Sequence, residues 1–415
     1  MATLLIGATI LITGQGLLLA FVPLKLRLMG SGISDIAAIT ACYFVGFLAG
    51  AWWNERVIRA VGHIRAYGGL IAIVVLATLS LGLMRDPESW IAMRFLHGMA
   101  AGGAFLAIES WLTAAANGPD RGRMLAAYTV CTLAALGGSQ FLVGIYNIGS
   151  SDLIILAGMI YAASIFPVML TRIAAPEIEP SPPLSLGNVF RVSPFAVVAS
   201  FAAGVTLGGF WALGPLYGAQ QGLEPHQVST LMASAIFAGL VLQWPAARLS
   251  DLIDRRIVVL GLTVACTVMA LSMLIPWVGR IVPIYVPFGV IGSTFCLYPL
   301  AVAHGIDNAS GGVNTLQVSR GLLLANGLGL AIGPFAAGEC AVIWGGPGLM
   351  IFFAMVLGSV ALVTAIRMVT RRSPPSDQKE PFVFVRTNTP AGAVIDPRNS
   401  ATIASNTDGQ PATNS

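Results

Sequence analysis

The sequence predicts an all-α integral membrane protein with twelve transmembrane helices in two six-helix pseudo-repeats. Only 10% of the 415 residues are charged and 56% are hydrophobic, whereas soluble proteins carry about 25% charged residues. Apolar runs of about 20 residues, long enough to cross roughly 30 Å of hydrocarbon, recur along the chain. Charged loops of similar type follow the second and the eighth run, which indicates an internal repeat.

The first half of the chain, residues 1–171, is predicted to form a six-helix bundle. Its apolar runs cover residues 3–24, 35–53, 66–84, a fourth run that begins at Trp90, 124–144 and 153–171. The first run lacks a basic leading segment and is too long for a cleaved signal peptide, so we interpret it as a transmembrane helix.

A change of composition separates the halves. Residues 172–193 are polar and contain Pro176, Pro180, Pro182 and Pro183, which is typical of a linker. Residues 194–370 hold the second set of runs, at 195–217, 228–247, 257–278, 281–303, 316–340 and 349–368. Residues 371–415 are too polar to bury a core and are predicted to be a disordered tail.

The distribution of cations predicts the orientation. An even number of helices places both termini on one side, and bacterial cytoplasmic loops are enriched in lysine and arginine. With the termini inside, the inner loops carry Arg56, Arg59, Arg65, Arg121, Arg123, Arg172, Arg191, Arg248, Arg255, Arg256, Arg371 and Arg372. The outer loops carry only Lys25, Arg27, Arg85 and Arg280. We therefore expect a multi-pass protein of the bacterial inner membrane with cytoplasmic termini.

Several functions are disfavoured by the sequence. It contains no Walker lysine motif, no G-x-S-x-G and no H-E-x-x-H, so we predict neither an enzyme nor a cofactor or metal site. The five cysteines lie in or beside apolar runs and are interpreted as packing residues. A net charge of +4 gives no indication of nucleic-acid binding. The expected partners are a small-molecule solute, protons and the bilayer, and we expect a monomer.

The fourth run carries the most unusual residues, Arg94, His97 and Glu109. Charged groups inside a membrane helix are costly and mark solute or proton paths. Arg94 could snorkel outward or point inward as a coupling group. His97, on the same face as Arg94, is either a packing residue or a protonatable partner. For Glu109 we favour a structural clamp with Arg121, Arg123 or Arg56 over a proton carrier.

Two loops and two helices resemble the major facilitator superfamily. Residues 247–256 resemble its G-x-L-x-D-R-x-G-R-R signature, with Asp251, Arg255 and Arg256 in place, whereas the loop after the second run has no aspartate there. Arg94-x-x-His97-Gly98 resembles its R-x-x-Q-G motif, and residues 329–338 resemble its glycine-proline bend motif. Further motifs, such as Glu109-Ser110-Trp111-Leu112, are similar to the bacterial YcaD-type branch.

The resemblance implies a transporter whose first, fourth, fifth, seventh, tenth and eleventh helices face a cavity. Candidate residues of the substrate path or coupling are then Gln15, Arg94, His97, Glu109, Gln140, Trp211, Tyr298 and Asn326. Interhelical hydrogen bonding by the amides, and packing by Trp211 and Tyr298, are the alternatives. The implied cytoplasmic gate comprises Arg56, Arg121, Arg123, Arg248, Asp251, Arg255 and Arg256.

Three further expectations complete the prediction. The glycine pairs at 46/50, 98/102, 204/208 and 329/333 are expected to pack helices. His304, Asp307, Asn308 and Asn314 are expected in a solvated loop after the tenth helix. We predict a secondary active transporter that moves a small organic solute by alternating access. Export is favoured over import, and proton coupling and uncoupled facilitation both stay open; the alternative is a membrane sensor or scaffold that does not transport.

Overall fold

The computed structural model describes residues 1–115, 120–171, 186–275, 278, 283–309 and 315–370, and all its regular elements there are helices. Twelve helical segments are long and apolar enough to cross a membrane. The prediction of an all-helical, twelve-span protein is therefore confirmed. We call the side of the membrane on which α1 begins and α16 ends the termini side, and the other the far side.

Nine helical segments make up the first half of the chain and the stretch that follows it. They are α1 (Ala2–Leu28), α2 (Ile33–Val61), α3 (His63–Leu83), α4 (Pro87–Ala115), α5 (Asp120–Gln140) with the 3-10 turn η1 (Phe141–Gly144), α6 (Asp152–Ala163), α7 (Ile165–Met169) and α8 (Leu186–Val192). Helices α6 and α7 together form the sixth span. The short helix α8 lies within residues 172–193, the predicted linker.

The second half contains α9 (Pro194–Gln220), α10 (Pro225–Leu252), α11 (Arg255–Ser272), α13 (Tyr285–Gly292), η2 (Ser293–Cys296), α14 (Leu297–Asp307), α15 (Thr315–Trp344) and α16 (Gly348–Thr370). One span, Tyr285–Asp307, is thus built from α13, η2 and α14. It extends four residues beyond the predicted end at Ala303.

The two halves repeat details of each other. Helices α1 and α9 are both 27 residues long, and each has a proline five residues before its last residue, Pro23 and Pro215. Helix starts are fixed locally: the Gly32 backbone N–H donates to Asp35 before α2, and the Ala196 N–H donates to Ser193 before α9. Such caps satisfy N–H groups that have no partner within the helix.

Glycines bring α2 and α4 into backbone contact. A Cβ atom on Gly46 would lie 2.2 Å from the Phe95 carbonyl oxygen, and one on Gly98 would lie 2.1 Å from that of Tyr43. Gly50 is equally close to Met99. Any side chain at these positions would force the two helices apart, so the predicted packing role of these glycines is confirmed.

The same device joins α9 to α15 in the second half. A Cβ atom on Gly204 would lie 2.0 Å from the Asn326 carbonyl oxygen, and one on Gly333 would lie 2.2 Å from that of Val205. Pro334 lies inside α15, with its ring against Gly208. These two helix pairs form the tightly packed backbone contacts of the two bundles.

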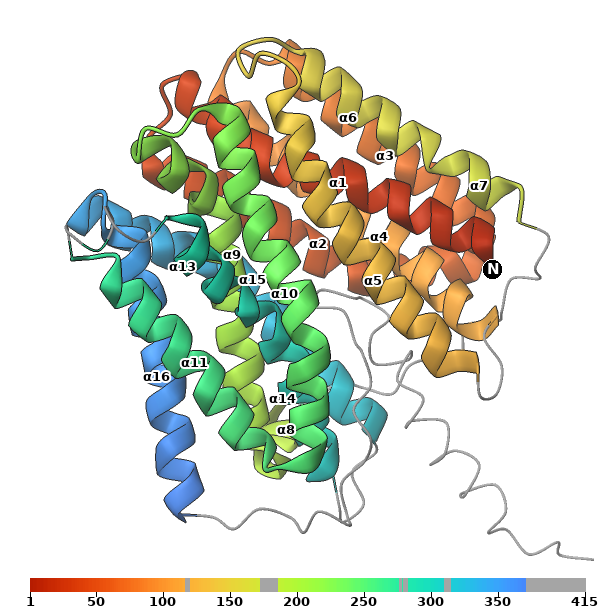
Figure 1. Ribbon diagram of the computed structural model, residues 1–415. Helices are drawn as coiled ribbons and strands as arrows, with labels where there is room; N and C mark the ends of the chain where they lie inside the picture. The colour runs from red at the N-terminus through yellow and green to blue at the C-terminus, as the bar shows by residue number, and fades with distance from the viewer. Residues whose placement is uncertain (116–119, 172–185, 276–277, 279–282, 310–314, 371–415) are drawn as a thin grey trace, which may run out of the picture.

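Helices α5 and α10 of the two halves meet on the far side. Figure 1 shows the ribbons of α5 and α10 close together at their upper ends and well apart at their lower ends. A Cβ atom on Gly144 would lie 3.2 Å from the His226 Cβ, and one on Gly137 would lie 2.9 Å from the Phe237 ring. Helix α1 also packs against α9, whereas no comparable contact joins α4 to α14 among the described residues. Helices α5 and α10 therefore diverge toward the termini side.

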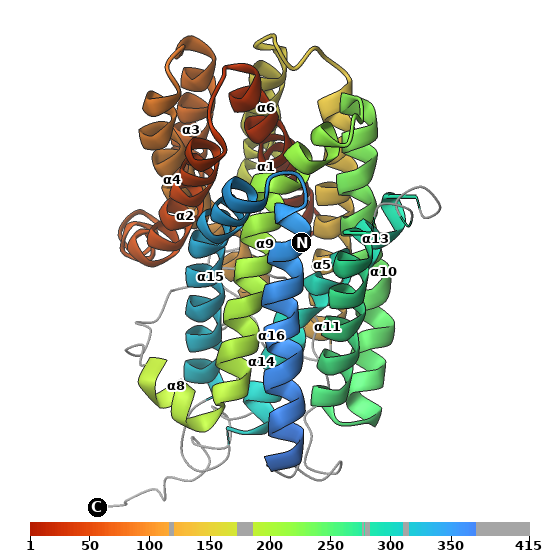
Figure 2. The ribbon, with the colours of Figure 1, turned by 90° about the vertical axis from the view of Figure 1, so that its left-hand side faces the viewer.

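A second seam joins α2 to α15, which lie side by side in Figure 2. A Cβ atom on Gly338 would lie 2.9 Å from the Ala37 Cβ, and one on Gly327 would lie 2.7 Å from a Leu48 methyl group. Nearer the termini side, Arg320 of α15 interacts electrostatically with Glu55 of α2. Small residues at this seam let helices of different halves approach closely.

Candidate functional site

A buried polar cluster lies inside the first bundle, between α2, α3, α4 and α6. Its centre is Arg94 of α4, which is 1% exposed and whose guanidinium carbon lies 4.3 Å from the centre of the Tyr43 ring. Among the described residues Arg94 forms no ion pair, and its Nε and Nη1 atoms have no hydrogen-bond acceptor. The inward orientation considered for this residue is thus the one observed.

His97 lies one turn further along α4 and belongs to the same cluster. Its Nδ1 atom is 3.4 Å from the Thr78 hydroxyl and its Nε2 atom is 3.2 Å from the Tyr161 hydroxyl. The Tyr43 and Tyr161 rings meet the imidazole edge to face. These contacts join four helices through one imidazole.

Glu109 is fully buried near the termini side of α4. The Tyr128 hydroxyl of α5 donates a short hydrogen bond to its Oε1 atom. Of its three expected basic partners, Arg56 and Arg123 are exposed and the Arg121 side chain lies outside the described residues. The observed contact with Tyr128 was not anticipated, because a tyrosine nineteen positions away carries no sequence signal for a carboxylate.

Two of the three candidate amides join helices. Gln140 of α5 donates to the Gly16 carbonyl of α1 at 3.2 Å, and Asn326 of α15 donates to the Ser200 carbonyl of α9 at 3.0 Å. The side-chain oxygens of Gln15, Gln140 and Asn326 are buried and accept no hydrogen bond from the described residues. Gln140 and Asn326 thus each tie two helices together and leave one acceptor available.

The two candidate aromatics are both 1% exposed within the second bundle. Trp211 of α9 packs edge to face against Phe210 and Phe295, with ring centres 5.1 and 6.5 Å apart. Tyr298 lies in the first turn of α14. In this conformation both rings are enclosed by protein.

An ionic network joins helix ends on the termini side of the second bundle. The Arg255 guanidinium, at the start of α11, donates from Nε and Nη2 to the two Asp307 oxygens at 2.6 and 3.3 Å. Asp251 lies 3.5 Å from the same group. Arg256 binds Asp254 and donates to the Arg367 carbonyl oxygen of α16. The network therefore links α10, α11, α14 and α16.

This network corrects one expectation. Asp307 and His304 are not in a solvated loop: both lie in α14, the Asp307 side chain is 4% exposed and His304 is buried beside the Phe195 ring. The apolar pattern weakens after Ala303, so sequence reasoning ended the helix too early. Asn308 follows α14 directly and donates to the His304 carbonyl oxygen, while Asn314 lies outside the described residues.

The first bundle has a neutral contact where the second has the ionic one. His63 is the first residue of α3, as Arg255 is the first residue of α11. The His63 Nε2 atom lies 3.1 Å from the Ser110 hydroxyl of α4.

Arg248 and Arg56 are exposed at the ends of α10 and α2 and stack on tryptophan rings. Sequence reasoning also missed Glu55 and Arg320, which come together across the two halves.

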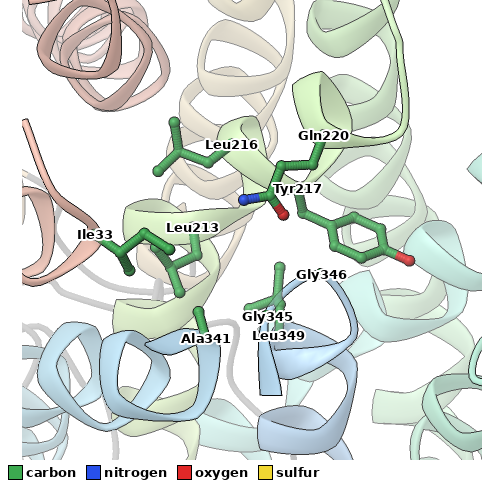
Figure 3. A pocket seen from close by; sticks show the side chains of 9 residues that line it. All are labelled: Ile33, Leu213, Leu216, Tyr217, Gln220, Ala341, Gly345, Gly346 and Leu349. Carbon is green, nitrogen blue, oxygen red and sulfur yellow. The ribbon is translucent and has the colours of Figure 1, made fainter. Parts of the chain in front are cut away.

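A shallow pocket lies on the far side, between the two halves (Figure 3). Ile33 of α2 faces Leu213 and Tyr217 of α9 and Leu349 of α16 across it. Most of the lining side chains are apolar, and Gln220 contributes an amide. No group of three or more potential metal ligands occurs in the described part of the chain.

Comparison with known proteins bears on the whole chain. A model of the Major Facilitator Superfamily matches residues 4–323. An uncharacterised MFS-type transporter, YcaD, of Escherichia fergusonii is 27% identical over 333 residues, which cover 80% of this chain and 86% of that protein. An uncharacterised MFS-type transporter of Yersinia pestis is 27% identical over 384 residues, covering 92% and 97%.

Solved structures show the same fold. The nucleoside transporter NupG superposes with a TM-score of 0.72 at 11% identity, covering 90% of this chain and 99% of that one. A bacterial homologue of the human lysosomal transporter Spinster, in an inward-facing and unoccupied conformation, has a TM-score of 0.62 at 13% identity, covering 96% and 97%. At these identities the likeness concerns the fold.

Proposed function

The chain belongs to the major facilitator superfamily and is a secondary transporter, and on this premise we propose that it moves a small organic solute by alternating access between its two bundles. The observation that carries this proposal is the unequal contact between the halves. Helices α5 and α10 touch on the far side and diverge toward the termini side, whereas α2 and α15 stay in contact along much of their length. Rocking about such a contact would expose a central path to each side in turn.

The few charges inside the spans support a neutral or weakly charged solute, which is taken to be exported. A strongly charged solute needs compensating groups, and Arg94 and Glu109 are already packed inside the first bundle against Tyr43 and Tyr128. The glycine-proline bend in α15 supports export, since it resembles the antiporter motif. The proposed orientation has cytoplasmic termini.

A disulfide across the far-side seam tests alternating access. Gly144→Cys and His226→Cys would place two Cβ atoms close to the 3.5–4.5 Å of a disulfide. The pair is introduced after the native cysteines are replaced, because Cys131 is exposed. Transport is first assigned from a compound panel with a deletion strain and membrane vesicles. Oxidation should then abolish transport, and reduction should restore it.

A second disulfide within one bundle provides the control. Gly82→Cys and Ser151→Cys join α3 to the start of α6 on the same side, where a Cβ atom on Gly82 would lie 3.8 Å from the Ser151 Cβ. This bond should leave transport intact. Unchanged transport with the first disulfide fully formed would contradict alternating access. Normal signalling without transport of any compound would instead favour the sensor.

Proton coupling through α4 is the second part of the proposal. His97 and Glu109 are the titratable groups within α4 that contact other helices through hydroxyl groups. Transport is measured with and without a pH gradient for wild type, His97→Ala and Glu109→Gln. Loss of gradient-driven accumulation in one variant identifies the carrier. If the wild type accumulates solute equally with and without the pH gradient, proton coupling is refuted.

A further inference from the structure

Two exposed tryptophan–arginine pairs occupy matching places in the two halves. The Arg56 guanidinium carbon lies 5.4 Å from the centre of the Trp53 ring, and that of Arg248 lies 5.6 Å from the centre of the Trp244 ring. The tryptophans are 63% and 60% exposed. Both distances are typical of a cation–π contact.

The repeat places these pairs equivalently. Helices α2 and α10 are the second spans of their halves, and each tryptophan lies eight residues before the end of its helix, at Val61 and Leu252. Each arginine follows its tryptophan by three or four residues. The same arrangement in both halves indicates a shared environment.

Helix geometry gives the depth of the pairs. Trp53 lies 20 residues from the far-side start of α2 at Ile33, and Trp244 lies 19 residues from the start of α10 at Pro225. At 1.5 Å per residue each ring is about 30 Å from the far end, which is the thickness of the hydrocarbon core. The rings therefore lie at the termini-side boundary, and the guanidinium groups lie about one turn beyond it.

Charge distinguishes these two arginines from their neighbours. Arg59 lies 3.8 Å from Glu55, and Arg255 and Arg256 bind aspartates. Arg56 and Arg248 form no ion pair among the described residues, and both side chains are exposed. Their N–H groups thus face the headgroup layer beside an amphipathic ring.

We propose that each tryptophan–arginine pair binds the headgroup of an anionic phospholipid. The indole lies against the glycerol region, and the guanidinium donates to phosphate oxygens, whose geometry its fork matches. Helices α2 and α10 also carry contacts between the halves, α2 with α15 and α10 with α5. Bound lipid would thereby contact helices that carry the interface of the moving halves.

Native mass spectrometry of the full-length protein in detergent tests this proposal. Phosphatidylglycerol or phosphatidylcholine is added, and the retained lipids are counted. The wild type should retain two phosphatidylglycerol molecules in preference to phosphatidylcholine. Arg56→Gln with Arg248→Gln should lower the apparent phosphatidylglycerol affinity about fivefold at each site, since one arginine near an anionic surface contributes about 1 kcal/mol.

The matched control is Arg65→Gln with Arg191→Gln, which removes two exposed cations from the same side without a neighbouring tryptophan. It should keep the wild-type affinity, and an equal loss would overturn the proposal in favour of unspecific attraction. Displacement of phosphatidylglycerol by equimolar inorganic phosphate would also overturn it, because a free anion would then be sufficient. If the double variant does not fold, each single variant should show the fivefold loss of affinity at one of the two sites.

Discussion

Asp307→Asn should be one of the most destabilising single changes on the termini side. The Arg255 side chain is 1% exposed and is held by both oxygens of Asp307, which is itself 4% exposed. Removing one partner of a buried pair costs about 3–5 kcal/mol, because the remaining charge stays buried. Asparagine keeps one acceptor oxygen and Asp251 remains nearby, so we expect about 3 kcal/mol. Unfolding by SDS in mixed micelles measures this loss.

Asp251→Asn is the internal control. This carboxylate binds the same guanidinium at 3.5 Å, but its side chain is 41% exposed. Exposed ion pairs contribute about 0–1 kcal/mol, so this change should cost less than 1 kcal/mol. Replacing the buried pair by Arg255→Met with Asp307→Leu should recover most of the stability. Equal losses for the two aspartate variants would refute the assignment of Asp307 as the principal partner.

Three further predictions follow from close contacts and exposure. Gly50→Ala should reduce the yield of folded protein, because the new Cβ would lie 1.9 Å from the Met99 carbonyl oxygen. Gly69→Ala is the control and should leave the yield unchanged, because no neighbouring atom lies within 4 Å of a Cβ there. Gel filtration compares the two yields. Tyr128→Phe should destabilise the protein by about 1–2 kcal/mol, since Glu109 loses a buried donor, and SDS unfolding measures it. Exposed Cys131 should react with N-ethylmaleimide in detergent while buried Cys266 stays unlabelled, as read by mass spectrometry.

Hydropathy was sufficient to predict the spans, because a helix that crosses hydrocarbon must be apolar over about 20 residues. Their ends were less predictable. Helix α2 continues through a charged segment to Val61, and α14 continues through Asp307. Helical hydrogen bonding extends into the headgroup layer, where hydropathy no longer distinguishes helix from loop. Asp307 was therefore assigned to a loop although it is buried.

The candidate residues illustrate a second limit of the sequence. The face shared by Arg94 and His97 follows from helical spacing, but their neighbours Tyr43, Thr78 and Tyr161 come from three other helices. Which helices surround a residue depends on packing between segments far apart in sequence. Glycine spacing predicted that helices pack closely. It did not predict which helices pack together, namely α2 with α4 and α9 with α15.

The structure adds one argument about how the two halves differ. At the start of the third helix in each half, the first residue contacts the fourth span: Arg255 binds Asp307, and His63 contacts Ser110. Separating the buried ionic contact would leave both charges without a partner in a buried place, so α11 and α14 are expected to move as one unit. The neutral contact in the first half is weaker, since one ordinary hydrogen bond contributes about 1 kcal/mol. Because α4 also holds Arg94, His97 and Glu109, the half with the weaker contact between its third and fourth spans also carries the titratable candidates. A change of protonation in α4 would therefore have to break only the weaker His63–Ser110 contact before the helices could move.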